Sequence, residues 1–151
     1  AVALSFGYDL TRHDKPYPET LSVLRRIRGE RPDVVIGIVS NTVVQAAVID
    51  HYLREQGILD LVDFRIVSSE LGWRKPHPAI YAAALAKAGV KPQEALFVGD
   101  RPLEDVIGPA RLGIRAALRT APGAKLSLPA GCDPVAVVEN LRGILELLSI
   151  S

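Results

Sequence analysis

Short apolar runs alternate with helical patterns along this chain, and that alternation limits the folds open to it. Val34–Val39 is a nearly unbroken β-branched run, and Phe64–Val67, Ala95–Val98 and Ala116–Leu118 are shorter runs of the same kind. Segments with apolar residues at helical spacing separate them. Strands that alternate with helices predict a parallel sheet with helices on both sides. The expected fold class is therefore α/β: a three-layer α/β/α sandwich around a mostly parallel, Rossmann-like sheet.

The composition indicates one folded domain and excludes several classes of function. The 151 residues are 48% apolar and 23% charged, which is typical of a globular protein with a single core. A net charge of +1 provides no electrostatic basis for binding nucleic acid or an anionic membrane. The single cysteine, Cys132, excludes an internal disulfide and suits a reducing compartment. We expect one cytoplasmic domain over residues 1–151, and the sequence indicates no oligomeric state.

Helices are expected wherever apolar residues recur three or four positions apart between these runs. The expected helices cover residues 18–28, 43–56, 79–88 and 105–112. A last helix is expected after Asp133-Pro134, with Val138, Leu141, Leu145 and Leu148 on one face. Residues 68–78 and 120–132 are expected as loops.

Two carboxylates follow the strand expected at Ala95–Val98. Gly99 allows a sharp turn, so Asp100 should project beyond the carboxyl end of the strand, and Asp105 begins the next helical pattern. Ligands bind at that edge in open parallel sheets. Two carboxylates repel each other there unless a cation, basic side chains or backbone amides compensate, and oxygen ligands suit Mg²⁺. The alternative is that Asp100 starts a turn and Asp105 caps a helix.

Further polar residues are expected at the same edge. Ser40 and Asn41 follow the strand Val34–Val39, and Lys75 lies in the loop before the helix at 79–88. A hydroxyl, an ammonium group and paired carboxylates suit phosphoryl chemistry, because the first two hold phosphate oxygens and the carboxylates hold a metal ion. Taken singly, Ser40 could cap the next helix and Lys75 could be a solvated loop charge.

In this order, the residues resemble the motifs of the haloacid dehalogenase-like (HAD) hydrolases. Val34–Asn41 resembles the second motif, an apolar strand that ends in Ser or Thr; Lys75-Pro76 is similar to the lysine motif; and Gly99-Asp100 with Asp105 is similar to Gly-Asp-x-x-x-x-Asp. The resemblance implies that Ser40 and Lys75 are catalytic and bind the phosphoryl group together with Asn41. It also implies that Asp100 ligates Mg²⁺ and that Asp105 completes the metal site.

The activity implied by the resemblance is Mg²⁺-dependent hydrolysis of a small phosphorylated metabolite through an aspartyl-phosphate. A phosphate- or partner-binding HAD-like domain without catalysis is the alternative. A metal-independent dehalogenase is a third, which the pair Asp100 and Asp105 disfavours.

The first motif of that family, Asp-x-Asp-x-Thr, has no intact counterpart here. In one interpretation the first strand, the nucleophile and a cap domain precede Ala1, and residues 1–15 are the end of that cap; the absence of methionine favours this interpretation. The sheet would then lack its central strand. In the other, Ala1–Phe6 is the first strand, Asp9 and Thr11 belong to a degenerate motif, and Gly7 stands in the nucleophile's position. On both interpretations, we expect these 151 residues alone to be weakly active or inactive.

Overall fold

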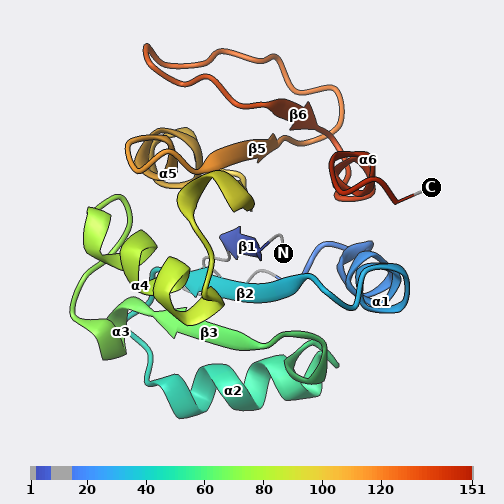
Figure 1. The fold of residues 1–151 in the computed structure, drawn as a ribbon, viewed down its shortest axis with the longest axis vertical. Helices are drawn as coiled ribbons and strands as arrows, with labels where there is room; N and C mark the ends of the chain where they lie inside the picture. Colours follow the sequence, from blue (N-terminus) through green and yellow to red (C-terminus); the bar gives the residue numbers. More distant parts are fainter. Residues whose placement is uncertain (1–2, 8–14, 151) are drawn as a thin grey trace.

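A computed structural model describes residues 3–7 and 15–150 of the chain. Its centre is one sheet in which neighbouring strands are parallel, in the order β3-β2-β1-β4-β5-β6 (Figure 1). The strands are β1 Ala3–Gly7, β2 Val35–Ser40, β3 Phe64–Val67, β4 Ala95–Gly99, β5 Arg115–Arg119 and β6 Ala136–Val138. The α/β fold class and the strands expected near residues 34–39, 64–67, 95–98 and 116–118 are confirmed.

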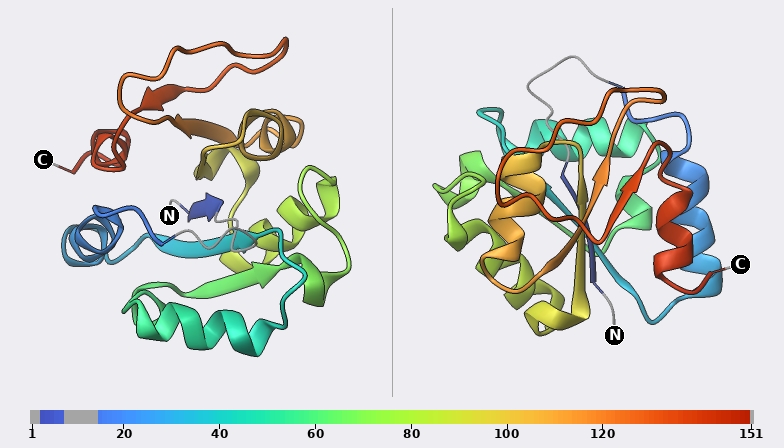
Figure 2. Two further views of the ribbon diagram at one scale, coloured as in Figure 1. Left: turned by 180° about the vertical axis from the view of Figure 1, so that it is seen from behind. Right: turned by 90° about the horizontal axis from the view of Figure 1, so that it is seen from above.

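Helices cover both faces of the sheet. They are α1 Thr20–Glu30, α2 Ala46–Glu55, α3 Ser68–Leu71, α4 Pro78–Ala88, α5 Gly108–Ala110 and α6 Gly143–Leu147. The 3₁₀ helices η1 Leu59–Leu61 and η2 Pro92–Glu94 and the π-helix η3 Pro102–Ile107 lie between them. Seen from above, α4 and α5 lie on one side of the sheet and α1 and α6 on the other (Figure 2). Among the described ranges, no helix is long and apolar enough to cross a membrane.

Alternate residues of β4 pack into the two cores that result. Leu96 and Val98 contact the core formed with α1, α2 and α6, whereas Ala95 and Phe97 contact the core formed with α4. A strand covered on both sides is apolar at every position, which explains the unbroken run seen in the sequence.

The last helix differs from the expectation. Ala136–Val138 pairs with β5 as the edge strand β6, and α6 begins only at Gly143. Val138 is β-branched and follows Val137, so the local preference for extended backbone prevails over helical spacing. Asp133-Pro134 therefore precedes a strand and does not start a helix.

Two smaller differences concern the loops of the carboxyl edge. Residues 68–71 form the short helix α3 within the expected loop, and Gly72 ends it with a φ of 85°. The helical segment expected from Asp105 begins earlier, at Pro102, because proline suits the first position of a helical turn.

The central strand of the sheet is β1. Its residues pair with β2 on one side and β4 on the other, with Gly7 opposite Val39 and Phe6 opposite Val98. The expectation that the sheet lacks its central strand is therefore wrong, because Ala3–Gly7 occupies that position. Asp9 and Thr11, assigned above to a degenerate first motif, lie outside the described residues.

Candidate active site

A buried ion pair between Lys75 and Asp105 lies at the carboxyl edge of the sheet. The Lys75 Nζ is 2.8 Å from Asp105 Oδ1, and the two side chains are 4% and 1% exposed. Asp105 Oδ2 accepts hydrogen bonds from the backbone N–H groups of Asp100 (3.1 Å) and Arg101 (3.0 Å). Burial raises the pKa of the Asp105 carboxyl, while the Lys75 ammonium acts in the opposite direction. Asp105 thus fixes both the lysine and the turn that carries Asp100.

Gly99 is required by this packing. A Cβ atom on Gly99 would lie 2.3 Å from the Asp105 Cγ, closer than any real contact. The glycine therefore allows the carboxylate to lie against the end of β4, which gives a physical reason for Gly-Asp followed by a second aspartate.

We expect Gly99→Ala to lower the free energy of unfolding by about 1–3 kcal/mol, because the new methyl group must displace the Asp105 carboxylate from its partners. Urea denaturation measures the change. Gly29→Ala is the matched control: a Cβ there meets nothing within 4 Å in α1, so it should stabilise by about 0.5–1 kcal/mol. A Gly99→Ala protein as stable as the unmodified chain would contradict the proposed steric role.

The Asn41 side chain positions the lysine loop. Its Nδ2 donates to the Lys75 carbonyl (3.0 Å), and its Oδ1 accepts from the Lys75 backbone N–H (2.7 Å). This buried amide therefore ties the end of β2 to the segment that carries the ammonium group. Ser40, the last residue of β2, is also fully buried.

Asp100 itself is exposed and contacts a residue that the sequence did not single out. Tyr17 donates from its hydroxyl to Asp100 Oδ2 at 2.9 Å. The Arg119 guanidinium lies 3.4 Å from the centroid of the Tyr17 ring and forms an ion pair of 3.5 Å with Glu19. Burial and the Asp100 carboxylate raise the pKa of Tyr17 to about 12, so it remains a donor at neutral pH. No motif could have identified Tyr17, since 83 positions separate it from Asp100.

A magnesium ion fits these residues through one carboxylate. Mg²⁺ in proteins takes one or two carboxylates and completes its shell with water and phosphate. Asp100 is exposed and can supply one, whereas the oxygens of Asp105 already accept three hydrogen bonds. The geometry therefore favours Asp100 over Asp105 as the residue that would contact the ion. Among the described residues, no cluster of three or more His, Cys, Asp or Glu side chains could hold a metal.

Gly7 ends the central strand between the two segments that carry Ser40 and Asp100. Its backbone lies opposite Val39, and β4 on the other side ends at Gly99. A side-chain nucleophile would come from this position in the chemistry implied by the family resemblance, and glycine has none.

The chain is similar to enzymes of known activity over most of its length. The family model described as haloacid dehalogenase-like hydrolase matches residues 3–113. The glyceraldehyde 3-phosphate phosphatase of Methanopyrus kandleri is 32% identical over 66% of this chain and 41% of its own length. The pyrimidine 5′-nucleotidase YjjG of Escherichia coli is 32% identical over 88% of this chain and 56% of its own. The chain thus spans about half the length of these relatives.

Solved structures share the fold. A HAD phosphatase from Thermococcus onnurineus superposes with a TM-score of 0.75 at 26% identity, over 89% of this chain and 58% of that one. A protein from Listeria monocytogenes, with a TM-score of 0.77 and 24% identity, covers 99% of this chain and 97% of its own, and shows the fold alone. Together with the family match and the sheet order, these similarities show that the chain belongs to the haloacid dehalogenase-like hydrolases.

Proposed function

We propose that the carboxyl edge of this sheet is the phosphoryl site of a Mg²⁺-dependent phosphomonoester hydrolase that acts on a small phosphorylated metabolite. The carrying observation is the cluster in which Asp105 holds Lys75 on one oxygen and the Asp100 turn on the other. The buried Asp105 carboxylate thus holds the Lys75 ammonium group on one side and the turn that carries the exposed Asp100 carboxylate on the other. Relatives that are named phosphatases and a nucleotidase support the substrate class.

Each residue has a distinct role in this proposal. Ser40 and Lys75 bind the phosphoryl oxygens, and Lys75 offsets their negative charge in the transition state. Asn41 positions Lys75 through its backbone. Asp100, oriented by Tyr17, holds the metal ion, which when bound screens the charge between substrate and protein. Asp105 positions both groups.

Hydrolysis through an aspartyl-phosphate also requires a carboxylate nucleophile. Gly7 cannot supply one, so we propose that residues 1–151 bind phosphomonoesters but hydrolyse them weakly or not at all. The second candidate function, a phosphate-binding domain without catalysis, is favoured by this same observation. The two differ in whether a carboxylate completes the site.

Binding of ribose 5-phosphate, measured calorimetrically with and without MgCl₂, tests the proposal. We expect Mg²⁺ to strengthen binding by the unmodified chain. Asp100→Asn should weaken binding in the presence of MgCl₂ roughly tenfold, since a charged metal ligand is lost. Asp60→Asn, an exposed carboxylate in η1 before β3, controls for the change in net charge. If binding depends equally on Mg²⁺ in both variants, Asp100 is not the metal residue. Fast turnover by the unmodified chain would contradict the proposal that it hydrolyses phosphomonoesters weakly or not at all.

A further inference from the structure

A hollow opens beside this edge, at the ends of β2 and β3. It has a volume of about 400 Å³, and its wall includes Thr42, Val43, Trp73 and Arg74. Val43 is 86% exposed and Trp73 is 51% exposed. These two exposed apolar side chains line the same hollow, and a concave site with an apolar wall suits an apolar part of a ligand.

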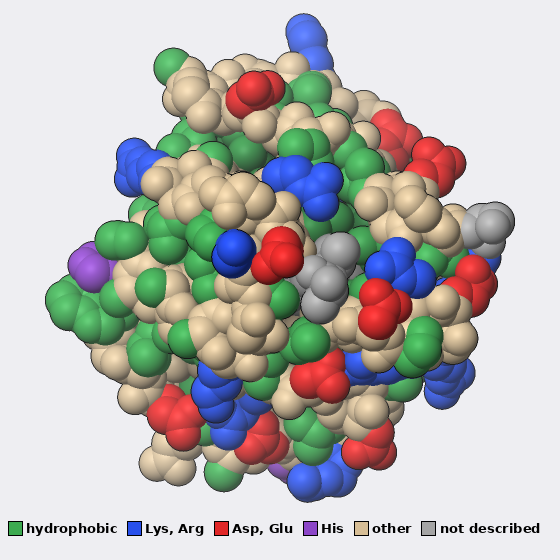
Figure 3. All heavy atoms as spheres, in the orientation of Figure 1, with side chains coloured by type: hydrophobic (Ala, Val, Ile, Leu, Met, Phe, Trp, Pro, Cys, Tyr) green, Lys and Arg blue, Asp and Glu red, His purple; other side chains and the backbone are tan. Residues whose placement is uncertain are grey.

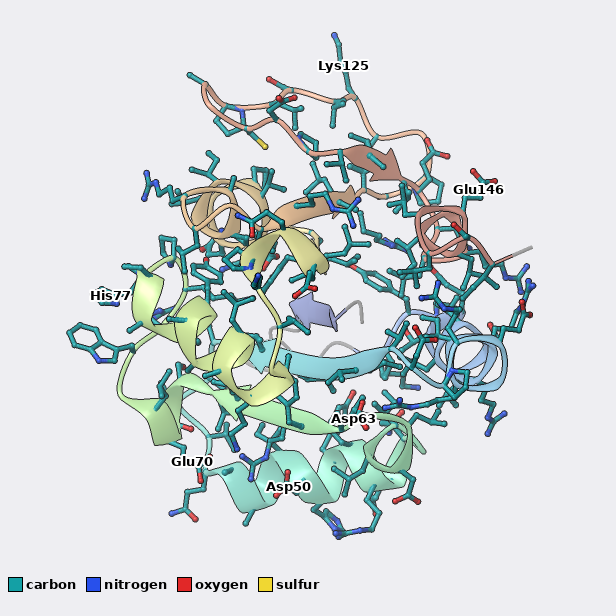
Figure 4. All side chains as sticks on the ribbon, in the orientation of Figure 1. Asp50, Asp63, Glu70, His77, Lys125 and Glu146 are labelled. Atoms are coloured by element: carbon teal, nitrogen blue, oxygen red, sulfur yellow. The ribbon has the colours of Figure 1, made fainter. Side chains whose placement is uncertain are left out.

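Trp73 is held in place although it is exposed. Its ring stacks on His77 with centroids 4.0 Å apart and an interplanar angle of 15°. His77 is fixed in turn as the N-cap of α4, where its Nδ1 accepts from the Ala79 backbone N–H at 3.2 Å. His77 projects at the outer edge of the molecule (Figure 4), and apolar side chains lie next to the histidine seen at that edge in Figure 3. A ring ordered in advance loses little entropy when it stacks on a ligand.

Several residues that line the hollow are neighbours in sequence of the proposed phosphoryl-binding residues Ser40 and Lys75. Asn41 and Thr42 directly follow Ser40, and Trp73 and Arg74 directly precede Lys75. The Asn41 amide ties these segments together through the Lys75 backbone. Asn41 also lines the hollow, so a phosphomonoester held by Ser40 and Lys75 would have the hollow on its Asn41 side.

We propose that the hollow binds the flat aromatic or heteroaromatic part of a phosphomonoester, such as the base of a nucleoside monophosphate, by stacking it against Trp73. The inference rests on the proposed function and narrows its substrate class. Val43 contributes an apolar contact, and the Arg74 guanidinium offers a planar cation that suits a ring with polar substituents. An ordinary sugar phosphate would leave the hollow unfilled.

The single tryptophan of the chain makes a direct test possible, because all tryptophan fluorescence comes from Trp73. The unmodified chain is titrated in MgCl₂ with uridine 5′-monophosphate and, separately, with ribose 5-phosphate, which lacks only the base. We expect quenching by the nucleotide and little change with the sugar phosphate. Equal responses to both would overturn the inference, as would a spectrum that changes on dilution without ligand, since that would mark the face as a contact between two copies.

Calorimetry on variants separates this inference from the proposed function. Trp73→Ala should weaken binding of uridine 5′-monophosphate roughly tenfold, the effect expected for one lost base–aromatic stack, and leave ribose 5-phosphate unaffected. Val137→Ala, exposed on the far edge strand β6, should change neither. If ribose 5-phosphate binds the unmodified chain but Trp73→Ala changes the affinity for both ligands by the same factor, only the stacking subsite is rejected. If neither ligand binds the unmodified chain, the proposed function fails, and the subsite with it.

Discussion

Lys75→Met is expected to lower the free energy of unfolding by about 3–5 kcal/mol. Methionine fills a similar volume but removes the ammonium group, so the Asp105 carboxylate, 1% exposed, loses its only described cationic partner at hydrogen-bond distance. Breaking a buried pair in this way is costly because the remaining charge has neither water nor a counter-ion. Urea denaturation measures the change. Lys87→Met, at an exposed position of α4, is the matched control and should stay within about 0.5 kcal/mol.

The loss should depend on pH in a defined direction. Burial already raises the pKa of Asp105 above its ordinary value of 3.8, and removal of Lys75 raises it further. A carboxyl whose pKa is higher in the folded than in the unfolded state favours folding below the unfolded pKa, and this contribution is lost as pH rises through the folded pKa. The Lys75→Met defect should therefore be smallest near pH 4 and grow towards neutral pH.

A double variant distinguishes a charge effect from a packing effect. In Lys75→Met/Asp105→Asn the amide is neutral, and its oxygen can still accept from the Asp100 and Arg101 backbone N–H groups. We expect it to recover roughly 1–3 kcal/mol relative to Lys75→Met alone. No recovery would mean that the single variant loses stability through misfitting side chains and not through an unpaired charge.

Gly7→Asp is expected to give the largest change in activity. Gly7 ends the central strand, opposite Val39 and between the segments that carry Ser40 and Asp100. A carboxylate introduced there stands where the family resemblance requires the nucleophile, and a nucleophile held in position gains a high effective concentration. We expect Mg²⁺-dependent hydrolysis of p-nitrophenyl phosphate to rise roughly 100-fold or more over the unmodified chain.

Gly7→Asn is the control for this gain, because asparagine has the same size but cannot form the aspartyl-phosphate. Gly7→Asp/Asp100→Asn should lose the Mg²⁺-dependent part of the new activity. A phosphorylated protein trapped by acid quench and detected by mass spectrometry would identify the covalent intermediate. Equal rates in Gly7→Asp and Gly7→Asn would falsify the assignment of Gly7 to the nucleophile's position.

The fold class, and the edge at which polar residues gather, follow from the order of residues along the chain. Apolar runs ending in Ser40 and Asp100 predict strands that leave their polar residues at one edge, because parallel strands share a direction. The sequence also predicted Lys75 and Asp105 for the same edge, and the structure brings these two into contact. Their chemical roles remain predictions.

Which groups meet at that edge depends on the three-dimensional packing of the chain. The Tyr17 hydroxyl donates to Asp100, and the Asn41 amide binds the Lys75 backbone. Asp105 accepts from Lys75 on one oxygen and from the backbone N–H groups of Asp100 and Arg101 on the other. The packing also placed Ala3–Gly7 at the centre of the sheet and made Val138 part of a strand. The spacing of apolar residues along the sequence indicates only on which face of its own helix or strand a residue lies. Register between strands and the packing of distant loops depend on the whole chain, and these set the partners of each polar group.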